Sequence, residues 1–390
     1  MATIFLATEA DEGMGHIAPW LDFVQLSLLQ HHGVHMAAPN VGQLEHLMGA
    51  SLGLNVWQAP HVPHGTSSEH ANPKSWPELL VFLGYGNAGL LSGLVKAWVN
   101  ILKNSRADVL IADYAPAAQL AAKALGIPVI EAGGGFCVPP LSPALCFPGV
   151  QSHGLARVAQ ADALLSQTFT TVLRGMGCNH HLSSLAAYAA WPARRVVLSP
   201  PELDHYGPRA QVTYLGLLGL GPAKGRLAKR PVAANQKPSQ IVGYLKRNTP
   251  GLQALIAQLA EACIDAHLHV PGSPSNASSL SRGSVRVQSE PVNFLDALPQ
   301  AAIYLSNGGL NGVGQALHHG CWPIVVPMQA EQVAMARNLV RHKRGDVWMA
   351  DVALPPSQLK RLFAAGQALP LLARPVQPPE SALLRLIETL

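Results

Sequence analysis

The stretch "SNGGLNGVGQALHHGCWPIVVPMQAEQ", residues 306–332, follows an apolar segment and carries adjacent glycines near its start. It predicts a strand ending at Ser306, a glycine-rich turn, a helix from about residue 312, a strand over 323–327 and a helix from about residue 331. Glycines let backbone N–H groups approach a ligand, and the positive end of the following helix points to the same place. The stretch therefore predicts a parallel sheet with an anion site, typically for phosphate, at its edge. A turn needed only for helix packing is the alternative.

The residues of this stretch that can bind a ligand fall into two groups. The first group supplies backbone N–H groups and side-chain amides at the turn, and comprises Asn307, Gly308, Gly309, Asn311 and Gly312. The second group is the pair Glu331 and Gln332 after the next strand, whose carboxylate and amide can bind vicinal hydroxyls. Phosphate donors beside hydroxyl-binding side chains suit a nucleotide sugar. The alternative is a helix N-terminus that favours acid and amide side chains in its first turn.

Both halves of the chain alternate apolar strands with helices. The predicted strands cover residues 4–7, 34–39, 108–113 and 127–133, and then 240–245, 266–272, 284–288 and 301–306. Strands that are apolar throughout and joined by helices indicate a parallel sheet covered on both faces. The segment 221–238 is rich in Pro, Gly and Lys and is predicted as a linker between domains 1–220 and 239–390. We therefore expect two Rossmann-like, doubly wound α/β domains that bind ligands at the carboxyl ends of their strands, across a cleft.

The composition is that of a packed globular protein. Of 390 residues, 48% are hydrophobic and 13% charged, and the formal net charge is +5. The basic runs at 224–230 and 341–344 lack interleaved aromatic residues, so we expect no nucleic-acid partner. No apolar run is long enough to span a membrane, and we expect no transmembrane segment. The five cysteines show no disulfide or metal spacing, which indicates a reducing, cytoplasmic location.

A histidine and an aspartate suggest acid–base chemistry in the first half. His16 lies where the loop after the first strand meets a helix, and an imidazole with an ordinary pKa near 6.5 suits a general base. Asp113 ends another strand of the same predicted sheet, where a carboxylate can orient that imidazole. A capping or core histidine is the alternative. The remaining histidine pairs lack acidic or cysteine partners at metal-binding spacing, so no metal site is predicted.

The same loop raises the possibility of a dinucleotide-binding enzyme. Gly13, Gly15 and Ala18 have the spacing of the dinucleotide fingerprint. Five residues separate the strand from Gly13, however, and Asn40 stands where a ribose-binding acid is expected. These two departures argue against a dehydrogenase. The favoured interpretation is that the loop contributes Gly13 and Gly15 to a donor or acceptor site.

Taken together, these residues resemble the inverting nucleotide-sugar glycosyltransferases of the GT-B fold, which include plant and bacterial natural-product glycosyltransferases. The resemblance is carried by Gly15-His16, by Asp113 in "LIADYAP" and by "NGGLNGVGQALHHGCWPIVVPMQAEQ". It implies a metal-independent hexosyltransferase without a cofactor, in which His16 is the base and Asp113 orients it. It also implies a nucleoside diphosphate sugar as donor, most often a UDP-sugar with a TDP-sugar as the alternative. A monomer or homodimer is expected.

The chain departs from the family pattern at several donor positions. Asn307, Gly312 and Gln315 stand where the family usually has His, Thr and Glu. Val292 and Phe294 lie nearest the expected nucleobase. These departures keep two further functions open, a non-catalytic nucleotide-sugar-binding partner of an active transferase and a GT-B-type sugar epimerase.

The acceptor is expected among the loops of the first half, at residues 60–90 and 133–150. Their aromatic content predicts a small apolar or aromatic molecule that carries a hydroxyl. The candidate acceptor-binding residues are Trp76, Phe82, Tyr85, Phe136 and Phe147. Each of them is equally consistent with a place in the core.

Overall fold

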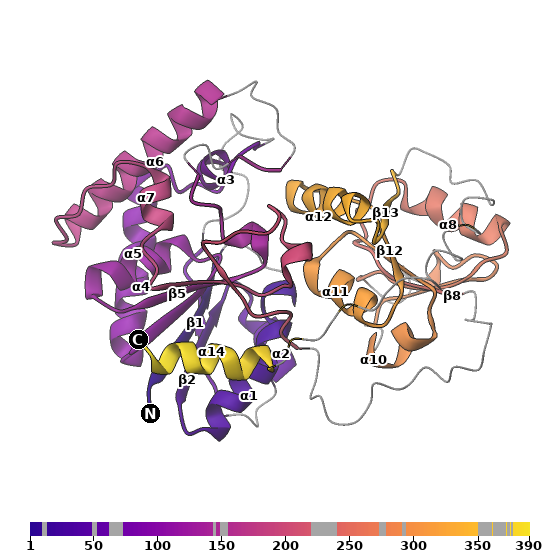
Figure 1. The fold of residues 1–390 in the computed structure, drawn as a ribbon, viewed down its shortest axis with the longest axis horizontal. Helices are drawn as coiled ribbons and strands as arrows, with labels where there is room; N and C mark the ends of the chain where they lie inside the picture. Colours follow the sequence, from indigo (N-terminus) through magenta and orange to yellow (C-terminus); the bar gives the residue numbers. More distant parts are fainter. Residues whose placement is uncertain are drawn as a thin grey trace. The chain divides into compact units, whose positions relative to one another are not determined.

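The computed structural model contains two compact units. It describes the chain apart from residues 10–13, 49–52, 62–72, 143–145, 149–154, 220–239, 273–277, 291–293, 350–360 and most of 362–376. Unit 1 comprises Met1–Gly219 together with Gln377–Leu390, and unit 2 comprises Leu220–Val376. Each unit is built around one parallel sheet (Figure 1).

Unit 1 contains a seven-stranded sheet in the order β3-β2-β1-β4-β5-β6-β7. The strands are β1 (Thr3–Thr8), β2 (Gly33–Ala38), β3 (Asn55–Gln58), β4 (Val109–Asp113), β5 (Val129–Gly133), β6 (Arg194–Val197) and β7 (Thr213–Tyr214). The helices are α1 (Leu21–Leu29), α2 (Val41–Met48), α3 (Trp76–Phe82), α4 (Ala88–Ser105), α5 (Pro116–Leu125), α6 (Leu155–Gly175), α7 (Leu185–Ala189) and α14 (Pro379–Glu388). Every residue of β4 and β5 is buried, as expected of strands covered on both faces.

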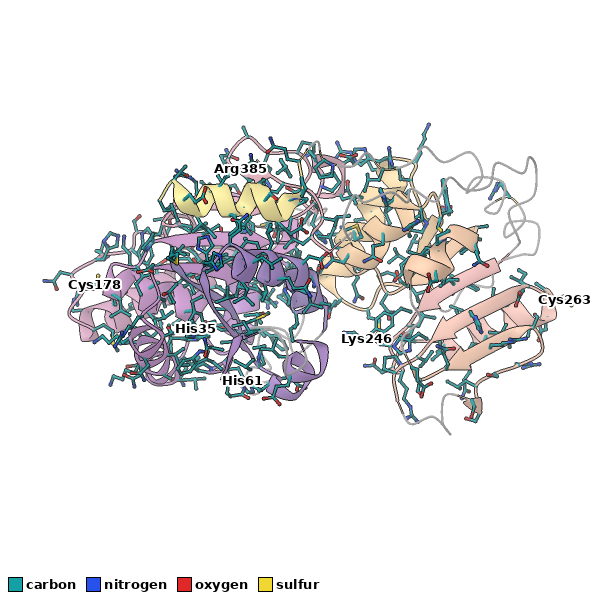
Figure 2. The ribbon with its side chains drawn as sticks, turned by 90° about the horizontal axis from the view of Figure 1, so that it is seen from below. His35, His61, Cys178, Lys246, Cys263 and Arg385 are labelled. Atoms are coloured by element: carbon teal, nitrogen blue, oxygen red, sulfur yellow. The ribbon has the colours of Figure 1, made fainter. Side chains whose placement is uncertain are left out.

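Unit 2 contains a six-stranded sheet in the order β10-β9-β8-β11-β12-β13. The strands are β8 (Gln240–Tyr244), β9 (Asp265–His269), β10 (Val285–Gln288), β11 (Ile303–Ser306), β12 (Trp322–Val325) and β13 (Asp346–Val347). The helices are α8 (Leu252–Glu261), α10 (Phe294–Ala297), α11 (Leu310–His318) and α12 (Ala330–Arg341). Lys246 follows β8 and Cys263 precedes β9, and Figure 2 shows them at opposite ends of this sheet.

Local sequence sets the limits of the helices next to the candidate site. Helix α5 begins with Pro116, whose missing N–H costs nothing in the first turn, and ends at Gly126 in the left-handed conformation, φ 70°. Helix α11 begins at Leu310 and α12 at Ala330, close to the starts expected at about 312 and 331. The predicted doubly wound α/β class is confirmed in both units.

The order of the strands defines a topological switch point in each sheet. In unit 1 the chain moves outward from β1 to β2 and β3, and then crosses to β4 on the other side of β1. In unit 2 it does the same between β8 and β11. The loops after two such neighbouring strands diverge to opposite sides, which leaves a crevice at their carboxyl ends where ligands of these folds bind. The loops after β1 and β4, and after β8 and β11, are therefore the first places to look for a site.

The end of the chain corrects the predicted domain limits. The sequence places residues 239–390 in one domain, but Gln377–Leu390 belongs to unit 1. Helix α14 lies against α1 (Figure 1), and Leu383, Leu384 and Ile387 join the core under the first sheet. The Gly219 N–H also donates to Glu380 at 3.1 Å. The apolar face of this short helix has no signal that distinguishes one sheet from another, so the sequence could not place it.

Candidate functional site

The central feature of unit 1 is a contact between His16 and Asp113 at its switch point. His16 ends a 3-10 helix, Met14–His16, in the connection after β1, and Asp113 is the last residue of β4. Their Nδ1 and Oδ1 atoms lie 3.0 Å apart. The side chains are 13% and 8% exposed, so the imidazole is the more accessible partner. The pair predicted from the sequence is brought together by the adjacent register of β1 and β4, in which Thr8 lies opposite Asp113.

Two further residues hold this pair, and the sequence gives no signal for either. The indole N–H of Trp20 donates to Asp113 Oδ2 at 3.1 Å, which fixes the second carboxylate oxygen. Gly133, at the end of β5, makes room for the first oxygen, because a Cβ built there would lie 2.6 Å from Asp113 Oδ1. Trp20 fits the apolar spacing of a helix, and Gly133 is one of three consecutive glycines, so neither stands out by pattern.

The backbone turns sharply after Asp113 and places an aromatic ring on the histidine. Tyr114 adopts a left-handed conformation, φ 55°, which is uncommon for a residue with a bulky side chain. Its ring lies 6.4 Å from that of His16 with an interplanar angle of 24°. The turn lets Pro116 start α5 two residues later. His16 therefore contacts a carboxylate and lies beside an aromatic ring.

A buried glutamate, also missed by the sequence interpretation, lies just after β1. The side chain of Glu9 is 4% exposed and accepts hydrogen bonds from the Ala117 N–H at 3.0 Å, the Ala118 N–H at 2.5 Å and the Tyr85 hydroxyl at 2.9 Å. It thus caps the N-terminus of α5, whose dipole favours a negative charge. Burial nevertheless raises the pKa of Glu9 to about 7, although these hydrogen bonds oppose that shift. Glu9 ties β1 to the helix that follows β4.

Two of the predicted acceptor residues are corrected by this environment. Tyr85 is 3% exposed and is committed to Glu9, and Trp76 is 2% exposed and lies 6.1 Å from the Tyr188 ring. Both are core residues, because α3 and the segment after it pack inward. Phe82 is half-buried. Patterns of aromatic residues cannot distinguish a core helix face from a binding surface.

Phe136 and Phe147 lie behind a cavity of about 330 Å³ in unit 1. Their rings are 4.8 Å apart, and the Phe136 ring stacks at 6.3 Å on Tyr206, which lines the cavity. Arg209 also lines it and donates through Nε to Asp204 at 2.8 Å and through Nη1 to the Val138 carbonyl at 2.7 Å. These bonds anchor the loop after β5. Both phenylalanines are buried, so they shape the cavity from behind.

In unit 2, Asn307 joins the two loops of the switch point. Its Oδ1 accepts from the Lys246 N–H at 2.7 Å, and its Nδ2 donates to Thr249 Oγ1 at 3.1 Å and to the Val326 carbonyl at 2.9 Å. The side chain is 4% exposed. The sequence predicts that this amide contacts a donor, but the structure commits it to protein partners. Asn307 therefore holds the loops after β8, β11 and β12 together.

The glycines after β11 have different physical roles. Gly308 has φ 98°, and a Cβ there would lie 2.7 Å from Val325 Cγ1, so only glycine is accommodated. Gly309 is the exposed N-cap of α11, and nothing lies within 4 Å of a Cβ built on it. Gly312 faces the Tyr304 ring, whose Cζ would lie 3.0 Å from a Cβ. The turn thus presents the N-terminus of α11 with little side-chain cover.

The remaining donor candidates divide into described and undescribed residues. Gln332 is buried, and its Oε1 accepts from the Met328 N–H at 2.7 Å, which is the helix-capping alternative. Asn311 and Glu331 are half-buried at the starts of α11 and α12. Gly13, Val292 and the Phe294 side chain lie outside the described residues, and Gly15 is exposed.

Solved structures similar to this chain are glycosyltransferases. A glycosyltransferase of kitacinnamycin has 19% identity and a TM-score of 0.62, covering 100% of this chain and 95% of the other. SsfS6 of Streptomyces sp. SF2575, solved with thymidine diphosphate, has 19% identity and a TM-score of 0.59 over 100% of both chains. The spinosyn rhamnosyltransferase SpnG, solved with thymidine diphosphate and with spinosyn aglycone, has 17% identity in both structures, over 100% of both chains, and TM-scores of 0.62 and 0.60.

The two sheets and this similarity define the architecture: the chain has the GT-B fold. No protein-family profile matches the sequence. No curated protein sequence matches it either. Among the described helices, none has the length and hydropathy required to cross a bilayer.

Proposed function

We propose that this protein is an inverting glycosyltransferase that transfers a sugar from a nucleoside diphosphate donor to a hydroxyl of a small acceptor. The observation that carries the proposal is the 3.0 Å contact between His16 Nδ1 and Asp113 Oδ1 at the switch point of unit 1. A Gly-rich turn at the N-terminus of α11 lies at the switch point of unit 2. A base and a phosphate-binding turn are the two functions that such a transfer requires.

In the proposed reaction His16 acts as general base. Because Nδ1 faces Asp113, the role of taking a proton from the acceptor hydroxyl is assigned to Nε2. The oxygen attacks the anomeric carbon as the bond to the diphosphate breaks, and the configuration inverts. General-base assistance of this kind contributes about 10²–10⁴-fold in rate. Asp113, fixed by Trp20, keeps the imidazole in the correct tautomer and stabilises the imidazolium.

The diphosphate is assigned to the turn after β11. The open backbone at Gly309 and the N-terminus of α11 provide N–H donors and a favourable dipole for the departing phosphates. This contribution substitutes for a metal ion in the proposed mechanism. Glu331, half-buried at the start of α12, is proposed to bind sugar hydroxyls. The thymidine diphosphate in SsfS6 and SpnG makes a TDP-sugar as strong a candidate here as the UDP-sugar expected from the sequence.

The acceptor is proposed to be a small apolar or aromatic molecule bound by unit 1. The cavity of about 330 Å³ beside Tyr206 and Arg209 lies within the usual volume range for small-molecule sites. Leu141 and Pro148 contribute apolar surface to its lining, and Ser142, Arg209 and Gln211 contribute polar groups that can bind a hydroxyl. Its contact with Phe136 and Phe147 runs through Tyr206, so these rings act by shaping the wall.

The experiment combines donor binding with turnover. Thermal-shift titration with UDP, TDP and their sugars identifies the donor, because a ligand that binds the folded state stabilises it by mass action. Reactions of that donor with a panel of hydroxylated aromatic and macrocyclic acceptors are then followed by mass spectrometry. We expect His16→Ala and Asp113→Asn to lower the rate of transfer at least about 10²-fold. The exposed His181 provides the matched control, and His181→Ala should retain the wild-type rate.

One observation favours a second function, a donor-binding protein without turnover. Asn307 is committed to protein partners, and Gly312 offers no side chain to a phosphate. Donor binding without product from any acceptor, and without release of the diphosphate, would support this alternative. Conversion of the donor sugar in the absence of acceptor would instead support the epimerase. Unchanged transfer by both His16→Ala and Asp113→Asn would overturn the proposed mechanism.

A further inference from the structure

A third potential ligand lies beside the His16–Asp113 pair. Cys137 ends a 3-10 helix, Gly135–Cys137, directly after β5. One ligand atom from each of His16, Asp113 and Cys137 can be chosen so that all three lie within 4.8 Å of one another. The thiol is 4% exposed, whereas the imidazole gives the group its accessible side. The three residues come from three separate segments: His16 from the connection after β1, Asp113 from the end of β4 and Cys137 from the connection after β5.

The geometry of β5 explains why the three groups converge. Gly133 ends β5 beside β4, and a Cβ there would lie 2.6 Å from Asp113 Oδ1 and 3.3 Å from Cys137 Cβ. The absent side chain at Gly133 therefore leaves space on the side of the carboxylate that faces the cysteine. Trp20 holds the other carboxylate oxygen, so Oδ1 is the one that faces this space.

We propose that His16, Asp113 and Cys137 form a site for a borderline-soft divalent transition-metal ion, with Zn²⁺ as the best fit. Imidazole, carboxylate and thiolate are the three side-chain ligands that zinc takes in proteins, and three protein ligands leave a fourth position for water. Tetrahedral ligands of zinc lie about 3.4–3.6 Å apart, given bond lengths of about 2.0–2.3 Å. In the present structure the three ligand atoms lie within 4.8 Å of one another, so metal binding requires these separations to adjust. One thiolate and one carboxylate balance the charge of the ion.

The consequence for activity rests on the proposed function. Coordination through Nδ1 requires that nitrogen to lose its proton, which moves to Nε2, and the Cys137 thiol releases one proton to solvent. The imidazole then has no free lone pair at Nε2 to accept a proton from an acceptor hydroxyl. The metal ion is therefore an inhibitor, and Cys137 makes the enzyme sensitive to it.

The binding test uses the full chain, reduced and freed of metal, without donor or acceptor. Titration with Co²⁺ should give a near-ultraviolet thiolate-to-metal charge-transfer band that reaches its maximum at one equivalent of Co²⁺. Zn²⁺ should displace the bound Co²⁺ and abolish the band. The band should be lost in Cys137→Ala and weakened in His16→Gln. The matched control is Cys178→Ala, since Cys178 is a half-buried free thiol at the edge of the same unit (Figure 2) and should leave the band intact. A band that survives Cys137→Ala, or no band in the wild type, overturns the site.

Two further measurements complete the test. The first uses the wild type and so does not depend on whether a variant folds, and the second links metal binding to activity. In the wild type, ¹¹³Cd NMR should show one ion with a single sulfur ligand, and a resonance from oxygen and nitrogen ligands alone would overturn the site. In the transfer assay, Zn²⁺ should inhibit the wild type and Cys178→Ala, while the ratio of rates with and without Zn²⁺ should approach one in Cys137→Ala. Failure of the proposed function leaves the cobalt and cadmium results unchanged, whereas failure of the metal site leaves transfer intact and insensitive to zinc.

Discussion

The ring of Tyr304 occupies the space that a side chain at Gly312 would enter. A Cβ built on Gly312 would lie 3.0 Å from Cζ of Tyr304 and closer still to its hydroxyl. Tyr304 is the second residue of β11 and is 2% exposed, and burial raises the pKa of its hydroxyl well above the ordinary value. The glycine that departs from the family pattern in the first turn of α11 is therefore coupled to a residue of the strand before it.

This coupling predicts a non-additive pair of substitutions. We expect Gly312→Ala to lower the free energy of unfolding by about 1–3 kcal/mol, because an added methyl group overpacks the site. Tyr304→Phe removes the nearest atom, so Gly312→Ala should cost less in that background, with a coupling energy of about 0.5 kcal/mol or more. Urea denaturation of the four proteins measures it. Strictly additive costs would show that the tyrosine does not restrict this position.

Trp20 is predicted to position Asp113 for catalysis. Trp20→Phe keeps an aromatic ring but removes the N–H that donates to Oδ2, and loss of one such bond should lower kcat about tenfold. The control is Trp76→Phe, since Trp76 is equally buried and its indole N–H has no hydrogen-bond partner among the described residues. Steady-state values of kcat for Trp20→Phe and Trp76→Phe, measured across the pH range, test this difference. Equal effects of both substitutions on kcat would reduce Trp20 to a packing residue.

Gly133 is predicted to tolerate no side chain. The Cβ of Gly133→Ala would lie 2.6 Å from Asp113 Oδ1, so the carboxylate must move, and displacement of a catalytic group by about 1 Å costs about 10²-fold in rate. Gly175→Ala at the end of α6 is the control, because nothing lies within 4 Å of a Cβ there. Rates and melting temperatures of both variants test the prediction. A fully active Gly133→Ala would contradict the observed crowding.

Glu9 is predicted to make stability depend on pH. Its folded-state pKa, about 7, is above the ordinary 4.5, so the native state binds more protons than the unfolded state between these values. Glu9 therefore contributes stability that is present below pH 4.5 and is lost as pH rises through 7, by about 3 kcal/mol in total. Glu9→Gln removes the titration, so its stability relative to the wild type should rise from pH 5 to pH 8.

Urea denaturation at intervals between pH 5 and pH 8 measures this difference. The comparison with the wild type cancels the contributions of other groups, including His205, whose pKa is lowered by burial to about 4 and which acts in the opposite direction. A difference between the two proteins that does not change with pH would show that Glu9 does not titrate in this range.

The candidate site was predictable from the sequence only in part. His16 and Asp113 could be paired because His16 follows one apolar strand and Asp113 ends another, and the carboxyl ends of neighbouring parallel strands meet at one edge. Trp20 and Glu9 could not be found in this way, because an indole in an apolar pattern and an acid after a strand carry no local signal. Trp76 and Tyr85 were misplaced for the same reason, since a core aromatic residue and a binding aromatic residue look alike in sequence.

The sequence alone determined that this chain forms two doubly wound sheets. The pattern that shows it is the alternation of apolar strands and helices, together with the glycines around residue 308. Periodicity and backbone freedom are local properties, so the order of residues is enough to reveal them. Only the tertiary structure decided that α14 returns to unit 1, that Asn307 faces inward, and that Cys137 approaches the His16–Asp113 pair. Those relationships join residues distant along the chain, and they depend on which buried surfaces fit together.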